Sequence, residues 1–248
     1  MMEKRLKDKV ALVTGGARGI GKAISELFAA HGAIVVILDV LEEGKVIAED
    51  IRSHGGRAEY YLLSVTDKNA VNQLCERVFA AYGRIDILIN NAGITRDRTL
   101  EKMTQEEWEM VMDVNLKGVF NCTQAVVPYM KENKWGRIVS AASNVGLRGN
   151  FGQTNYAATK AGIIAMSKTW TLELGKYGIT ANAVAPGLTM TEMVEKIPEK
   201  QLDAIIESIP LKTVAQPMDI AYGYLYLASD EARYVSGICL TIDGGISR

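Results

Sequence analysis

The fold of this chain is decided by Val10-Ala11-Leu12-Val13-Thr14-Gly15-Gly16-Ala17-Arg18-Gly19-Ile20-Gly21, where a short apolar run leads directly into a glycine-rich turn. The glycines of Gly15-x-x-x-Gly19-x-Gly21 allow a tight turn and let a pyrophosphate approach the backbone closely. A helical pattern follows, and the free N–H groups at the start of a helix favour anions. The glycines alone fit a plain strand-to-helix turn, but the strand before them and the helix after them predict a nucleotide-binding loop.

Apolar, β-branched segments alternate with helix-length segments along the rest of the chain. Strands are expected at residues 10–14, 34–39, 58–63, 85–90, 136–142, 180–185 and 238–242. These segments are short, apolar on both faces and bounded by turn residues, which is typical of buried parallel strands. A helix capping box is expected at Thr104-x-x-Glu107. We expect one domain over residues 1–248: a Rossmann-type, doubly wound parallel α/β sheet of seven strands flanked by helices.

The composition argues against several classes of protein. A formal net charge of −1 gives no support for a nucleic-acid surface or for binding to an anionic membrane. The charged N-terminus lacks the apolar run of a signal peptide, and no stretch approaches the ~18 uninterrupted apolar residues of a membrane span. Cys75, Cys122 and Cys239 are isolated, and His31 and His54 each stand near a helix end, so no metal site is expected. We expect a soluble, cytoplasmic protein with buried thiols.

The choice of dinucleotide depends on two charged residues. Asp39 ends the second expected strand, about twenty residues after the glycines, where a carboxylate can accept hydrogen bonds from both hydroxyls of the adenosine ribose. The same carboxylate would repel a 2′-phosphate. Alternatively, Asp39 serves only as an N-cap for the next helix. Arg18 argues for the other cofactor, because its guanidinium can pair with a 2′-phosphate. The pattern favours NAD(H) and leaves NADP(H) possible.

Asn90-Asn91-Ala92-Gly93 forms a second segment of small residues, at the end of the fourth expected strand. Small residues there let the riboses of a dinucleotide lie against the backbone, while the asparagine side chains brace neighbouring loops. A plain turn at the end of a strand explains this segment equally well when it is taken alone.

The reactive groups are expected in the second half of the chain. Ser143 stands thirteen residues before Tyr156, and Tyr156 stands four residues before Lys160, so the last two share one face of a helix. An unperturbed tyrosine has a pKa near ~10, and a cation a few ångströms away lowers that pKa. The arrangement predicts acid–base chemistry for the oxidation of an alcohol or the reduction of a carbonyl.

Together these motifs resemble the classical short-chain dehydrogenase/reductases over essentially the whole chain. The matching positions are residues 14–21 and 90–93, Asn115, Ser143, Tyr156, Lys160, Pro186, Gly187 and Thr191. Within that family the chain is most similar to the bacterial 3-oxoacyl-[acyl-carrier-protein] reductases, through residues 90–97, 234–237 and 243–245.

The resemblance implies a role for each matched residue. Tyr156 exchanges a proton with the substrate oxygen, and Ser143 hydrogen-bonds the same oxygen. Lys160 holds the nicotinamide ribose and lowers the pKa of Tyr156, and Asn115 holds a relay water at a helix irregularity. The implied cofactor contacts are Gly15, Arg18, Gly19, Ile20, Gly21, Asp39, Ser64, Val65, Asn91, Ala92, Gly93, Tyr156, Lys160, Pro186, Gly187, Thr189 and Thr191.

Three positions depart from the carrier-protein reductases. Ser64 replaces an aspartate that faces the adenine in many relatives, and Ala17 replaces a hydroxyl residue. Lys134 and Tyr177 stand where those reductases carry a basic pair beside the site entrance, so one charge is lost. The leading hypothesis is reduction of a 3-oxoacyl thioester carried by acyl carrier protein or CoA. The alternatives are an NAD-dependent secondary-alcohol dehydrogenase or ketoreductase acting on a smaller substrate, and a non-catalytic dinucleotide sensor.

Two further expectations concern the substrate and the assembly. Residues 189–211, where Pro198 and Pro210 bracket a charged helix, are expected to form a lid over the substrate. Relatives are usually homotetramers, packed through two long helices around residues 106–131 and 153–177. A stripe of apolar residues on these helices fits either a core or an interface: Val119, Val126, Ile163, Met166 and Trp170.

Overall fold

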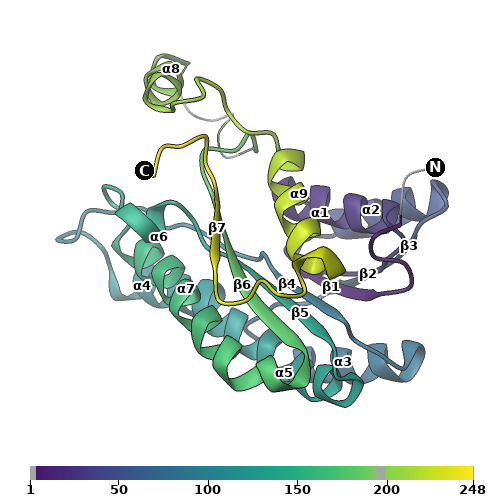
Figure 1. Ribbon diagram of the computed structural model, residues 1–248. Helices are drawn as coiled ribbons and strands as arrows, with labels where there is room; N and C mark the ends of the chain where they lie inside the picture. Colours follow the sequence, from purple (N-terminus) through teal and green to yellow (C-terminus); the bar gives the residue numbers. More distant parts are fainter. Residues whose placement is uncertain (1–3, 193, 195–198, 248) are drawn as a thin grey trace.

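A single parallel sheet organises the computed structural model, which describes residues 4–192, 194 and 199–247 (Figure 1). In this part of the chain, seven strands form the sheet in the order β3-β2-β1-β4-β5-β6-β7. The strands are β1 (Val10–Thr14), β2 (Ile34–Asp39), β3 (Arg57–Leu62), β4 (Ile87–Asn90), β5 (Gly136–Ala141), β6 (Ile179–Pro186) and β7 (Cys239–Ile242). All neighbours pair in parallel, and the order reverses between β1 and β4. The predicted doubly wound parallel fold is confirmed.

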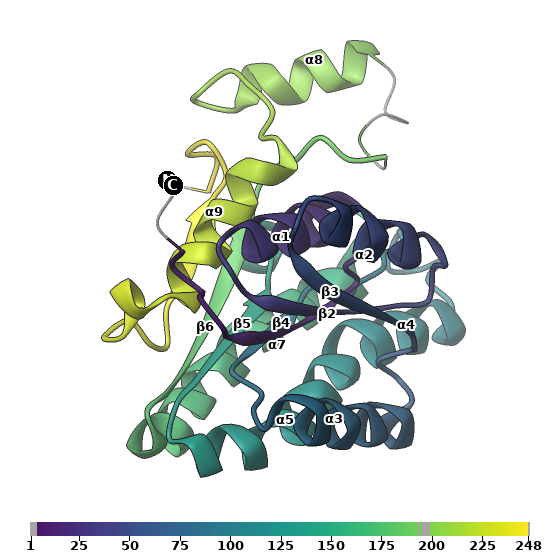
Figure 2. The same cartoon turned by 90° about the vertical axis from the view of Figure 1, so that its right-hand side faces the viewer.

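Helices cover both faces of this sheet (Figures 1 and 2). One face carries α1 (Gly19–Ala30), α2 (Glu43–Ser53) and α9 (Pro217–Ala228); the other carries α3 (Lys68–Tyr82), α4 (Gln105–Met112), α5 (Gly118–Asn133), α6 (Val145–Arg148) and α7 (Thr154–Leu174). Each layer buries its own apolar cluster, around Phe28 and Tyr224 on the first face and around Leu74 and Met130 on the second. The remaining helix, α8 (Glu199–Ser208), stands apart from both layers in both views.

The two edge strands differ from the expectation of full burial. Every residue of β1, β2, β4 and β5 is buried, but Leu62 in β3 is 58% exposed and all four residues of β7 are at least partly exposed. An edge strand has a neighbour on one side only, and the covering helices pack most closely over the centre of the sheet. The apolar pattern of β3 and β7 therefore predicted the strands correctly and their burial wrongly.

Local signals account for several element boundaries. The capping box is present, because Thr104 Oγ1 accepts a hydrogen bond from Glu107 N (3.1 Å) and Glu107 Oε2 accepts one from Thr104 N (3.1 Å). The strand β4 begins two residues later than expected. Asp86 is held before it by its side chain, whose Oδ2 accepts from Val10 N (2.8 Å) and pairs with Arg84 Nε (2.7 Å).

The apolar stripe on α5 and α7 is divided between core and surface. Val119, Val126 and Ile163 are buried inside one chain, whereas Met166 and Trp170 are partly exposed. The first three are therefore core residues, and a tetramer through these helices stays a prediction. Within the described residues, no helix combines the length and the apolar character needed to cross a bilayer.

Candidate active site

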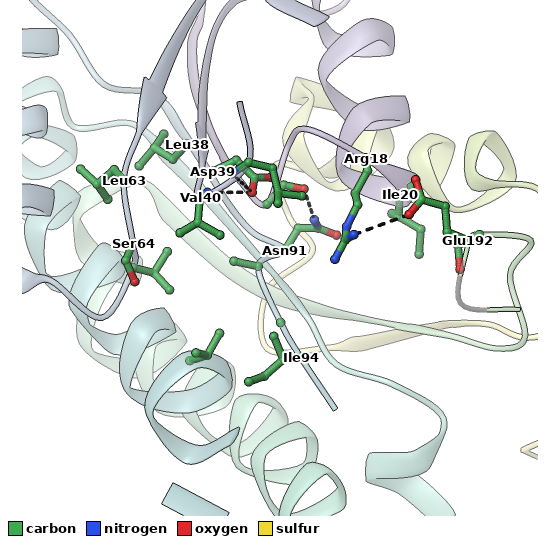
Figure 3. A pocket seen from close by; sticks show the side chains of 18 residues that line it. Arg18, Ile20, Leu38, Asp39, Val40, Leu63, Ser64, Asn91, Ile94 and Glu192 are labelled. Carbon is green, nitrogen blue, oxygen red and sulfur yellow. Dashed lines mark hydrogen bonds and ion pairs between the residues drawn. The ribbon is translucent and has the colours of Figure 1, made fainter. Parts of the chain in front are cut away.

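The predicted motifs converge at the carboxyl ends of the strands, where the sheet order reverses. A cavity of about 460 Å³ opens there between the β1–α1 loop, the end of β2 and the segment after β4 (Figure 3). Eleven of the predicted cofactor contacts line it: Gly15, Arg18, Gly19, Ile20, Asp39, Ser64, Val65, Asn91, Ala92, Gly93 and Thr191. Its volume lies in the range of small-molecule sites. The cavity thus gathers three predicted motifs that lie far apart in the sequence.

The glycine loop has the geometry that the sequence required. Gly15 and Gly19 have φ of +63° and +53°, which favour glycine. A Cβ on Gly15 would lie 2.8 Å from Ala92 Cα, and a Cβ on Gly21 would collide with the Gly15 carbonyl oxygen. Arg18 precedes α1 and has no acceptor group, so its side chain leaves the first N–H groups of the helix to an anion. These residues fit the diphosphate of a dinucleotide.

Asp39 closes the glycine loop onto the end of β2. Its Oδ2 accepts a hydrogen bond from Ala17 N (2.9 Å), and its Oδ1 accepts from Val40 N (2.8 Å) and Leu41 N (3.2 Å). The residue that precedes α2 is Glu42, so the alternative interpretation of Asp39 as that helix's N-cap is wrong. The carboxylate is held rigidly at the rim of the cavity, which suits a group that accepts hydrogen bonds from ribose hydroxyls.

The side chains of Thr14, Asn91 and Asn121 hold the cavity wall together, and only the bracing by Asn91 was expected from the sequence. Thr14 Oγ1 accepts hydrogen bonds from Asn91 N (3.0 Å) and Ala92 N (3.1 Å), while Asn91 Nδ2 donates to Gly15 O (2.9 Å). The bracing by asparagine is therefore confirmed for Asn91. Buried Asn121, on α5, donates from Nδ2 to Val65 O (3.0 Å) and holds the predicted adenine-binding segment. Asn121 and Val65 are 56 residues apart in the chain, so no local sequence pattern could have predicted their contact.

The three predicted catalytic side chains meet beyond β5. Ser143 follows the strand, and Tyr156 and Lys160 lie on the first turns of α7, with the Lys160 Nζ 5.4 Å from the centroid of the Tyr156 ring. Ser143 Oγ accepts a hydrogen bond from Val145 N (3.1 Å), and the Ser143 hydroxyl lies near enough to Tyr156 to act on the pKa of that tyrosine. Lys160 Nζ donates to Ala141 O (2.6 Å). The serine and tyrosine hydroxyls thus form one pair that can address a single substrate oxygen.

The pKa of Tyr156 shifts in the opposite direction from the one expected. Burial raises the pKa of Tyr156, and the hydrogen bond with Ser143 acts in the opposite direction without reversing the shift. Burial also lowers the pKa of Lys160 to about 8. The predicted lowering of the tyrosine pKa by Lys160 is not seen, because the ammonium is directed to Ala141 O and desolvation dominates. The protein's own groups therefore keep Tyr156 as a neutral phenol, ready to donate a proton.

Asn115 lies at the helix irregularity that the resemblance implied. It is fully buried in a π-helical turn, Asp113–Lys117, between α4 and α5. Its Oδ1 accepts from Ile94 N (2.8 Å) and its Nδ2 donates to Ile94 O (2.9 Å), so its side chain holds the segment after β4. A Cβ on Gly93 would lie 3.4 Å from Asn115 Oδ1 and 3.6 Å from Lys160 Nζ, which places both beside that glycine. The water-holding role stays a prediction.

Three further expected contacts, Pro186, Gly187 and Thr189, lie at the end of β6, outside the cavity's lining. A Cβ on Gly187 would lie 2.7 Å from Asp243 Cα, and Thr189 Oγ1 donates to Gly187 O (3.1 Å). Gly187, Pro186 and Thr189 are thus placed at the correct edge of the sheet, and their contacts with a nicotinamide stay predictions. Of the lid segment, α8 and Pro210 lie in the described part, whereas Pro198 lies outside the described residues.

Lys134 and Tyr177 do not lie beside this chain's catalytic residues. Lys134 comes just before β5 and Ser143 just after it, so about 20 Å of extended strand separates them. Tyr177 precedes β6 at the same edge as Lys134, because the starts of parallel strands share an edge. The expectation that Lys134 and Tyr177 lie beside the entrance of the site is therefore wrong for the site formed by this chain alone. Tyr177 does have basic neighbours, since the ammonium groups of Lys131 and Lys176 lie 4.7 and 5.2 Å from its ring centroid.

Comparison with known proteins agrees with this geometry. Residues 15–247 match the family described as "Enoyl-(Acyl carrier protein) reductase". The 3-oxoacyl-[acyl-carrier-protein] reductase FabG of Thermotoga maritima is 49% identical over 243 residues, which cover 98% of this chain and 99% of the relative. The (2S)-[(R)-hydroxy(phenyl)methyl]succinyl-CoA dehydrogenase subunit BbsD of Thauera aromatica is 42% identical, and 98% of each chain is covered. The crystal structure of gox2181 has a TM-score of 0.95 at 36% identity, covering 98% of this chain and 97% of that one.

Proposed function

Because the chain belongs to the short-chain dehydrogenase/reductase family of NAD(P)-dependent oxidoreductases, we propose that it reduces a 3-oxoacyl thioester to the 3-hydroxyacyl thioester. The observation that carries this proposal is the pair of hydroxyls on Ser143 and Tyr156, set beside a cavity that fits a dinucleotide. The identity of 49% with a 3-oxoacyl-[acyl-carrier-protein] reductase over nearly the whole chain supports the substrate class.

The protein's residues would divide the chemistry as follows. When bound, the reduced form of the nicotinamide would supply a hydride for the carbonyl carbon of the substrate. The Tyr156 phenol donates its proton to the carbonyl oxygen, and the Ser143 hydroxyl hydrogen-bonds that oxygen as negative charge develops there. The raised pKa of Tyr156 keeps the phenol protonated before the reaction. Lys160 is buried beside the tyrosine ring, from where it would hold the ribose hydroxyls of the cofactor.

NAD(H) is the cofactor that we propose. Asp39 is fixed at the rim of the cavity by three backbone N–H groups, so it cannot move away from a 2′-phosphate. A fixed carboxylate at this position favours two ribose hydroxyls over a phosphate dianion. Arg18, the cation in the same cavity, is the group that would favour NADP(H).

Acyl carrier protein is the thioester carrier that we propose, in keeping with the name of the Thermotoga relative. The lysines around Tyr177 support this choice, because they give that edge of the sheet a positive surface for an acidic protein. This use of the surface requires an assembly in which it faces another protomer's site, and that assembly stays a prediction. A CoA thioester is the second candidate, supported by the Thauera relative whose name describes a CoA substrate.

The 189–211 segment is proposed to act as a lid in an open position. Its helix α8 stands away from both helical layers, and Leu211 at its end is 70% exposed (Figures 1 and 2). Closure of such a segment over the catalytic hydroxyls would exclude water from the reacting carbonyl. A cytoplasmic location stays a prediction of the sequence.

The direct test is the rate of cofactor oxidation with acetoacetyl-CoA and with carrier-linked acetoacetate, measured with NADH and with NADPH at matched concentrations. Fast NADH-dependent reduction is expected, with a higher kcat/KM for the carrier-linked substrate. A higher kcat/KM for acetoacetyl-CoA would identify CoA as the carrier. Tight cofactor binding without reduction of either thioester would contradict the proposal and favour an alcohol dehydrogenase for a smaller substrate.

A further inference from the structure

The nucleotide cavity contains a carboxylate that sequence analysis did not assign. Among the described residues that line it, Arg18 is the single cation, and Asp39 and Glu192 are the two carboxylates. Glu192 enters the cavity from the segment after β6, far along the chain from the other two. Figure 3 shows the Arg18 guanidinium turned toward it, with the ion pair drawn as a dashed line.

This ion pair is placed where it affects the binding of a ligand more than the stability of the fold. Arg18 Nη1 lies 3.5 Å from Glu192 Oε2, and the two side chains are 63% and 67% exposed. An ion pair this exposed contributes little to folding stability. Both side chains remain free to rearrange around a bound molecule, unlike Asp39, whose carboxylate is held by backbone groups.

The backbone of Glu192 is held against the glycine loop. A Cβ on Gly19 would lie 3.3 Å from Thr191 Cγ2, so the residue before Glu192 packs on the loop. Met190 N donates to Ala215 O (2.8 Å), and Val194 N donates to Thr191 O (2.8 Å). The approach of Glu192 to Arg18 therefore follows from backbone contacts on both sides of it.

We propose that Glu192 is a specificity-determining residue for the cofactor and acts by positioning Arg18. This inference rests on the proposed function, because it concerns the nicotinamide dinucleotide of that reaction. A 2′-phosphate beside Asp39 needs a cation, and Arg18 is the one available in the cavity. To pair with the phosphate, Arg18 must leave Glu192, which then stands as an uncompensated negative charge. A ribose hydroxyl is uncharged and does not require Arg18 to leave Glu192. Glu192 therefore weakens the binding of NADP(H) and has little effect on the binding of NAD(H).

The test uses Glu192→Gln in the full chain, with the dissociation constants of NADPH and NADH measured by fluorescence titration without substrate. We expect the dissociation constant of NADPH to fall about fivefold to tenfold and that of NADH to change less than about twofold. In turnover, the KM for NADPH should fall with little change in kcat. Glu192→Asp, which keeps the charge, should restore the original preference.

Two matched variants make the test specific. Glu26→Gln removes the same charge from an ion pair on α1, where Glu26 Oε1 lies 3.8 Å from Lys22 Nζ and outside the nucleotide cavity, and it should leave the ratio of dissociation constants unchanged. In an Arg18→Ala background, Glu192→Gln should no longer produce the gain for NADPH, because the effect passes through Arg18.

Three results would overturn the inference: an unchanged NADPH-to-NADH ratio in Glu192→Gln, an equal gain for both cofactors, or the same gain for NADPH in the Arg18→Ala background. The titrations need no substrate, so they separate this inference from the proposed function. A shifted ratio without thioester reduction would contradict the function alone, whereas thioester reduction with an unchanged ratio would contradict the inference alone.

Discussion

Two regions of the molecule contrast with each other: the nucleotide-binding region between β1 and β4, and the region around α6 and α8, which we propose to face the substrate. In the first region two functional groups are buried and fixed, since Asp39 is 8% exposed and Asn115 is fully buried between backbone partners. In the second region large apolar side chains face solvent, since Phe151 is 88% and Leu147 is 47% exposed. Changes to the buried groups of the first region should therefore damage cofactor binding and folding together, whereas changes to the exposed apolar side chains of the second should alter substrate use alone.

The largest effect is expected at the point where the two regions meet. Tyr156→Phe removes the proton donor and keeps the ring, so kcat should fall by about 10³-fold or more. Cofactor binding should persist, because the ring and Lys160 remain. Stopped-flow reduction and a cofactor titration on the same sample check this prediction, and retention of a large part of the activity would exclude Tyr156 as the proton donor.

A glycine substitution tests how rigid the nucleotide region is. In Gly21→Ala the new Cβ would collide with the Gly15 carbonyl oxygen, so the loop must shift. We expect a loss of about 2–4 kcal/mol in the free energy of unfolding, together with a large loss of NADH affinity.

The matched control for that variant is Gly175→Ala. Gly175 has φ of −56° and no heavy atom within 4 Å of a Cβ built on it. An alanine there should be neutral or should stabilise the protein by about 0.4–1 kcal/mol. Urea unfolding of both variants measures the difference, and equal effects of the two substitutions would show that the loop is not tightly constrained.

The buried Lys160 should make stability depend on pH. Its pKa is about 8 in the folded protein, below the value of 10.5 for an exposed lysine, so the unfolded chain binds more protons between these two pH values. The free energy of unfolding should therefore rise with pH from about 8 to about 10, by about 2–3 kcal/mol from this residue.

The matched variant for this prediction is Lys160→Met, which has no proton to lose. Subtracting its unfolding free energy from that of the original protein, at each pH, isolates the contribution of the lysine from those of other titrating groups. A difference that stays constant between pH 7 and pH 10 would show that the lysine is not desolvated.

The smallest effect is expected in the region that we propose to face the substrate. Phe151→Ser replaces a side chain that is 88% exposed, so the free energy of unfolding should change by less than about 0.5 kcal/mol. The KM for acyl thioesters should rise a few-fold, because we propose that Phe151, in the segment between Ser143 and Tyr156, offers its exposed ring to the substrate. Tyr234→Ser, at a residue that is 96% exposed near β7, is the control and should leave this KM unchanged. Equal effects of the two substitutions on KM would remove Phe151 from the substrate site.

Much of the fold was predictable because its signals are local. The alternation of apolar strands with helices, the glycine loop and the Thr104–Glu107 capping box each depend on residues close together in the chain. The burial of β3 and β7 was predicted wrongly, because an apolar strand has the same pattern at an edge as in the centre. The places of Lys134 and Tyr177 were also predicted wrongly, because a motif alone does not say which end of a strand a residue occupies.

By itself, the sequence determined which residues form the strands, the phosphate-binding turn and the Tyr156–Lys160 pair, because neighbours in the chain fix backbone conformation and helix faces. Only the tertiary structure decided that burial keeps Tyr156 neutral, that Asn121 holds the Val65 segment, and that Glu192 meets Arg18. These properties depend on desolvation and on contacts between distant segments. Both arise only when the sheet brings the ends of its strands to one edge.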